Sequence, residues 1–140
     1  MRLPAACAFV VAASTLSTLL AQAPAIRTDE DYSKTMKEVG PLNMTLRKAL
    51  TSASEADVAS SSARLETLFK DVQAYWEAKK VEDASGFAKN AVTAAHAISQ
   101  AAAAHDMAAA NTAATTLGAQ CTSCHMAHRE RAADGSFHMK

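Results

Sequence analysis

Apolar side chains recur at alternating spacings of four and three residues in four successive segments of this chain. That spacing places them along one stripe of an α-helix, so each segment is predicted to be a helix with one buried face. The predicted helices span roughly residues 29–52, 55–80, 84–104 and 107–128. Because helices of similar length joined by short connections pack as bundles, the chain is predicted to be all-α, an antiparallel up-and-down four-helix bundle.

The four stripes differ in the size of their side chains. They run through Tyr32, Met36, Val39, Asn43, Leu46 and Leu50; Val58, Ser62, Leu65, Phe69, Val72 and Trp76; Ala84, Phe87, Ala91, Ala94, Ile98, Ala101 and His105; and Met107, Ala110, Ala114, Leu117, Cys121, Cys124 and His128. Beyond position 25 the chain has 26 Ala but only seven Val or Ile residues, so strands have almost no candidate segment. Residues 132–140 are expected to be a frayed tail.

Helix starts are marked by capping signals. Thr28 with Asp31, and Ser54 with Asp57, have the spacing of a capping box, and Asp106 can cap the last helix. Pro41 interrupts the first helix and removes one backbone hydrogen bond, so a kink or a break is expected there.

The first 25 residues have the layout of a secretory signal peptide. A short positive start at Arg2 precedes an uncharged stretch, residues 3–20, and small residues around Ala23 and Ala25 follow it. Cleavage near residue 25 would remove Cys7 and leave one exported domain, residues 26–140, in the periplasm or another compartment outside the cytoplasm. An uncleaved membrane anchor is the alternative, because roughly 18 apolar residues just span a bilayer.

Composition excludes several classes of protein. The chain is 49% hydrophobic, which argues against disorder, and its 14 basic and 14 acidic residues argue against a nucleic-acid binder. Without residues 1–25 the formal charge is −1. No second long apolar run follows, so the mature form is expected not to span a membrane.

One motif carries chemistry: Cys121-Thr122-Ser123-Cys124-His125. It matches Cys-x-x-Cys-His, the sequence to which c-type haem is attached. On a helix the two thiols lie on one face, where each can form a thioether with a vinyl group of one porphyrin, and the adjacent imidazole can bind the iron. One covalent haem c is therefore the predicted cofactor, and its bulk would fill a core that is rich in alanine.

Other uses of the two cysteines are weaker alternatives. A thioredoxin-like redox pair needs a βαβ context, and a disulfide within one helical turn has poor geometry. Zinc could use Cys121, Cys124 and His128, but only His96 and His105 could then complete a four-ligand set.

The chain resembles the class II c-type cytochromes, which include cytochrome c′ and the low-spin cytochromes of the c556 type. The haem motif lies near the C-terminus, and Arg129 follows His125 by four residues, as in the family's Cys-x-x-Cys-His-x-x-x-Arg ending. Met36, in Met36-Lys37-x-x-Gly40, corresponds to the family's distal residue on the first helix. Two positions depart from the pattern: Tyr32 replaces an Arg common in the family, and His128 replaces an aromatic residue.

The resemblance implies an exported monohaem electron carrier, not an enzyme. Met36 is expected to bind the iron opposite His125, giving a low-spin haem that passes single electrons to redox partner proteins. If Met36 only packs over the porphyrin, the iron has an open site for NO or CO, as in cytochrome c′. Met44 is the reserve ligand, and the resemblance leaves a homodimer through the first two helices as an option.

Covalent attachment predicts that the secreted polypeptide is heavier than its bare mature chain by the mass of one haem. Intact-mass spectrometry of the protein exported by a host with a haem-attachment system measures this directly. A bare chain would contradict the interpretation of the motif.

Overall fold

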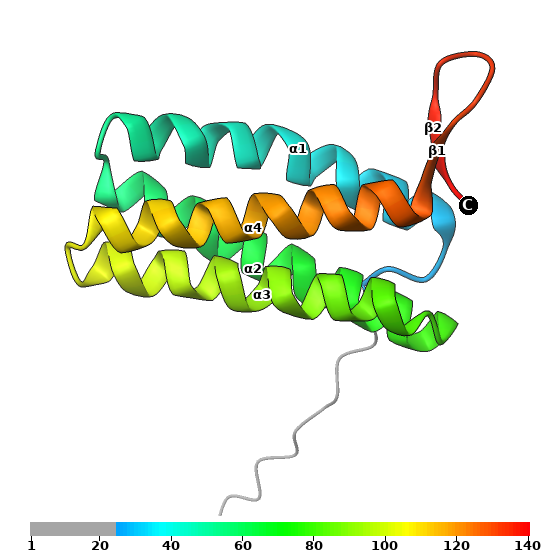
Figure 1. Ribbon diagram of the computed structural model, residues 1–140, viewed down its shortest axis with the longest axis horizontal. Coiled ribbons are helices and arrows are strands. Elements are labelled where there is room, and N and C mark those ends of the chain that lie inside the picture. Colours follow the sequence, from blue (N-terminus) through cyan, green and yellow to red (C-terminus); the bar gives the residue numbers. More distant parts are fainter. Residues whose placement is uncertain (1–24) are drawn as a thin grey trace, which may run out of the picture.

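The computed structural model describes residues 25–140, and residues 1–24 of the predicted export signal lie outside this part. Four helices, α1 (Asp29–Thr51), α2 (Glu55–Lys79), α3 (Glu82–Ala103) and α4 (Met107–His128), precede two short strands, β1 (Arg129–Arg131) and β2 (Phe137–Met139). The helices run alternately in opposite directions along one axis (Figure 1). The predicted four-helix bundle is confirmed. None of the helices within residues 25–140 has the length and apolar character needed to cross a membrane.

Two of the three predicted caps form. The Thr28 hydroxyl accepts a hydrogen bond from the Asp31 N–H (3.1 Å), and the Asp31 carboxylate accepts one from the Thr28 N–H (3.2 Å). Asp106 accepts from the Ala109 N–H. The capping box predicted at Ser54 is wrong, because its hydroxyl donates to the Asp57 carboxylate instead of accepting from the backbone. Beyond its cap, α1 continues unbroken through Pro41, which lies on an exposed face.

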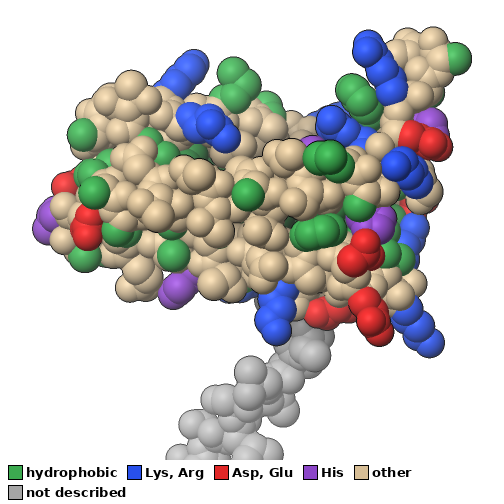
Figure 2. All heavy atoms as spheres, viewed as in Figure 1, with side chains coloured by type: hydrophobic (Ala, Val, Ile, Leu, Met, Phe, Trp, Pro, Cys, Tyr) green, Lys and Arg blue, Asp and Glu red, His purple; other side chains and the backbone are tan. Residues whose placement is uncertain are grey.

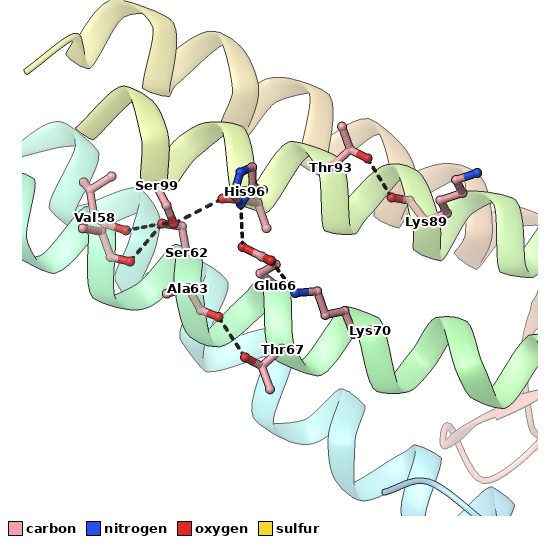
Figure 3. A network of polar contacts seen from close by, with 12 residues as sticks. Val58, Ser62, Ala63, Glu66, Thr67, Lys70, Lys89, Thr93, His96 and Ser99 are labelled. Carbon is pink, nitrogen blue, oxygen red and sulfur yellow. Dashed lines mark hydrogen bonds and ion pairs between the residues drawn. The ribbon is translucent and has the colours of Figure 1, made fainter. Parts of the chain in front are cut away.

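The core lies mainly between α2 and α3, which pack along their whole length. Every member of the predicted α2 stripe is buried, from Val58 to Trp76. The polar member, Ser62, donates to the Val58 carbonyl and shares a 2.7 Å hydrogen bond with Ser99 of α3 (Figure 3). Small side chains of α3, such as Ala95, are fully buried and allow the two helices to approach closely.

The contact between α1 and α4 is much smaller than the contacts between consecutive helices. Only two residues of α4 are buried, Ala110 and Leu117, so the predicted stripe is covered in the middle of the helix but not at its end. Cys121 and Cys124 are half-buried. The bundle is therefore open between α1 and α4 at the end where α4 finishes.

The frayed tail predicted for residues 132–140 is wrong, because β1 and β2 form an antiparallel hairpin. Gly135 turns the chain with a φ of +86°, a value that favours glycine. Across the strands Glu130 pairs with His138 at 2.9 Å, and Arg129 lies 4.1 Å from the centre of the Phe137 ring. The hairpin extends from the end of α4 (Figure 1).

Close packing of α2 and α3 predicts that a larger side chain at Ala95 destabilises the bundle. Ala95→Leu should lower the free energy of unfolding by about 1–3 kcal/mol, because the fully buried site has no room for three more carbons. Ala97→Leu, on the exposed face of the same helix, should change it by less than about 0.5 kcal/mol. Denaturant titration measures both, and equal effects would contradict the close packing.

Candidate functional site

A cavity lies between the helices at the end of the bundle where α4 finishes. Its volume is about 130 Å³, and it is partly open to solvent. The four residues predicted as the site, Met36, Cys121, Cys124 and His125, all line this one cavity.

The rest of the lining is mostly apolar. All four helices contribute to it: Tyr32 and Val39 come from α1, Phe69 and Val72 from α2, and Phe87, Ala88 and Ala91 from α3. The predicted α1, α2 and α3 stripes contain all of these residues except Ala88. The bundle core therefore continues into the wall of the cavity.

The two thiols are free and stand one helical turn apart on α4. Burial raises the pKa of the Cys121 thiol, and burial together with the neighbouring Cys121 raises the pKa of the Cys124 thiol to about 11. Both thiols are therefore protonated at neutral pH. Half-buried thiols beside an apolar cavity can react with a group that occupies the cavity.

His125 follows Cys124 on the same helix and is half-buried at the edge of the cavity. Burial lowers the pKa of its imidazole, and the nearby Arg129 guanidinium lowers that pKa further. The ring is thus kept neutral, which is the form that binds a metal ion.

Met36 reaches the cavity from α1, so the two predicted iron ligands come from different helices. Its side chain is half-buried and packs against the core. Met44, the reserve ligand, is 61% exposed and does not line the cavity. The structure therefore brings Met36, and not Met44, to the cavity that holds His125.

An aromatic cluster lies behind Tyr32, which lines the cavity. Tyr32 stacks on Tyr75 with ring centres 4.9 Å apart, and Trp76 meets both rings edge-on. Burial raises the pKa of the Tyr32 hydroxyl. Within residues 25–140 the buried Trp76 indole N–H has no hydrogen-bond partner.

His128 does not behave as the solvated residue that its place on the last turn suggests. Its side chain is only 17% exposed and bonds to the Asp83 carboxylate of α3 at 2.9 Å. The centre of its ring also lies 5.6 Å from the centre of the Trp76 ring. His128 therefore helps to hold the end of α4 against α2 and α3.

The two remaining histidines of the zinc alternative lie elsewhere. His96 pairs with Glu66, which also binds Lys70 (Figure 3), and His105 pairs with Glu55. Both imidazoles are exposed. In the described part of the chain, no group of three or more His, Cys, Asp or Glu side chains could hold a metal ion.

The chain matches no protein-family model, no curated protein and no solved structure. The residues fit a covalently bound haem in their chemistry: two thiols for thioethers, a neutral imidazole and a thioether sulfur for the iron, and apolar walls for the porphyrin.

The sequence did not indicate that the hairpin belongs to this region. Four residues of the hairpin, Ser136 to Met139, line a second space that adjoins the first and shares Tyr32, Met36 and His125 with it. The pair Asp134-Gly135, which favours a turn, was the available signal.

The raised thiol pKa predicts slow alkylation of the folded chain before haem attachment. With a pKa of about 11, roughly one Cys124 thiol in a thousand is ionised at pH 8, and the rate with iodoacetamide should rise as the pH approaches 11. Peptide mass spectrometry after quenching measures this. In denaturant the same thiol should react much faster at pH 8, and equal rates would contradict its burial.

Proposed function

We propose that this chain is an exported monohaem c-type cytochrome that carries single electrons. The observation that supports this most directly is that Met36, Cys121, Cys124 and His125 line one cavity. They come from the first and the last helix of the bundle, α1 and α4. Each has the chemistry that a covalent, six-coordinate haem requires.

Each of these side chains would have a distinct role. Cys121 and Cys124 would hold the porphyrin through thioethers formed when each S–H adds across one vinyl group. His125 would bind the iron from α4, and Met36 would bind it from α1. The haem supplies the one-electron chemistry by cycling between Fe(III) and Fe(II).

The remaining residues of the cavity would set the properties of that haem. Phe69, Val72 and Phe87 give one side of the site an apolar wall, and the Tyr32 ring, which packs on Trp76, lines another. A soft thioether ligand and an apolar surround favour Fe(II) over Fe(III), so both raise the reduction potential. The protein would thereby act as an acceptor for redox partner proteins outside the cytoplasm.

A site open to NO or CO is the second candidate, and one observation favours it. Met36 lies on α1, whose contact with α4 is much smaller than the contacts between consecutive helices. A small displacement of α1 would separate Met36 from His125 and leave one face of the iron free. The two candidates share the thioethers and the imidazole and differ only in the sixth ligand.

Met36→Ala tests the sixth ligand. The reduced, haem-loaded protein should show a low-spin optical spectrum that CO does not change, and the variant should become high-spin and bind CO, because it has lost its thioether. Met44→Ala is the matched control: it removes an exposed methionine of the same helix and should leave the spectrum unchanged.

A parent protein that is already high-spin and binds CO would support the gas-binding candidate. A low-spin spectrum that survives in Met36→Ala would exclude Met36 as the ligand.

A further inference from the structure

The space beneath the hairpin is a second lobe of the same cavity. Its volume is about 850 Å³, it is partly open to solvent, and it adjoins the first space through Tyr32, Met36 and His125. We call the first space the inner lobe and the second the outer lobe. The outer lobe is also lined by Ser33 and Lys37 of α1, Arg129 of β1, and Ser136 and His138 of the hairpin.

The two lobes differ in polarity. No cationic side chain of Lys or Arg lines the inner lobe, as far as residues 25–140 show, whereas Lys37 and Arg129 both line the outer one. Arg47, which lies beside Gly118, lines a separate space further along α1. Figure 2 shows Lys and Arg side chains gathered around the hairpin end of the molecule, with acidic side chains among them.

Those two cations are available for a ligand. Among the described residues neither Lys37 nor Arg129 makes an ion pair or a side-chain hydrogen bond. The one carboxylate that lines the outer lobe, Asp29, is already bound by Lys79 and by the Tyr75 hydroxyl, each at 2.6 Å. The outer lobe therefore has an excess of positive charge.

The hairpin holds one of these cations in place. The Arg129 guanidinium lies over the Phe137 ring of β2, 4.1 Å from its centre, so the side chain is kept at the rim of the lobe. Other hairpin residues also line the lobe, among them Ser136 and His138. His138 is held across the hairpin by Glu130.

We propose that the outer lobe is a carboxylate-binding subsite, in which Lys37 and Arg129 take the two carboxylate groups of the tetrapyrrole whose ring lies in the inner lobe. This inference rests on the proposed function and adds an orientation: the carboxylate edge of the ring faces the hairpin. An ionised carboxylate placed instead among Phe69, Val72 and Phe87 would be buried without a charged partner, which is strongly unfavourable. Charge-assisted hydrogen bonds from ammonium and guanidinium groups favour the outward orientation.

Zero-length cross-linking of the haem-loaded protein tests this contact. A water-soluble carbodiimide activates a carboxylate, the Lys37 amine displaces the activating group to form an amide, and the carbodiimide leaves as a urea that has taken up the elements of water. We expect a product in which the peptide carrying Lys37 is joined by an amide to haem on the Cys121–Cys124 peptide. Tandem mass spectrometry locates the bond on the haem or on a protein carboxylate.

The chain supplies its own controls. Lys79 and Asp29 form a 2.6 Å ion pair between α2 and α1 and should cross-link in every sample, which shows that the reagent works. Lys34, one turn before Lys37 and outside the lobe, pairs with Glu30 and should not join the haem. Lys37→Gln should abolish the haem cross-link, and Arg129→Lys should add a second one from its new amine.

The outcomes separate this inference from the proposed function. A purified chain without haem overturns the proposed function and this inference with it. Haem that is present but joins no lysine, while Lys79 and Asp29 do cross-link, overturns the inference alone. A bond from Lys37 to Glu or Asp instead of the haem also overturns it.

Discussion

The packing of α2 against α3 is the interaction on which the rest of the structure depends. These helices share the most extensive contact in the bundle and bury Leu65 and Ile98 completely, and Ser62 of α2 shares a hydrogen bond with Ser99 of α3. Buried alanines of α3 such as Ala95 let the two helices approach closely. The contact between α1 and α4 is much smaller. The candidate site lies between these two helices, where they are not packed against each other.

Much of the fold and of the site follows from the local sequence. The stripe through Val58, Leu65 and Trp76 is fully buried, because a 3.6-residue period with large apolar side chains leaves a helix no other stable placement. The antiparallel order of the helices then brings the start of the first helix to the end of the last. Met36 and His125 therefore meet at one cavity, although neither position alone indicates a cavity.

Features that depend on competition between nearby groups were not predictable in this way. Ser54 has the spacing of a capping residue, yet its hydroxyl donates a hydrogen bond to the Asp57 carboxylate instead of accepting one from the backbone, so the side-chain cap does not form. The hairpin is stabilised by pairs across its strands, such as Glu130 with His138, whose partners a helical period does not reveal. His128 is held by Asp83, 45 positions away in the sequence, so its burial depends on how α3 and α4 pack.

The site residues lie on the first and last helices, so the site can form only after nearly all of the bundle has folded. Met36 and Cys121 are 85 positions apart, so the final turns of α4 must fold beside α1 before the pocket exists. A prosthetic group bonded to Met36 and Cys121 would close the chain between them, which is most of the domain, into a ring. That ring would restrict the unfolded chain and hold α1 and α4 together, although their direct contact is small. Attachment of that group would then join the first and last helices of the bundle.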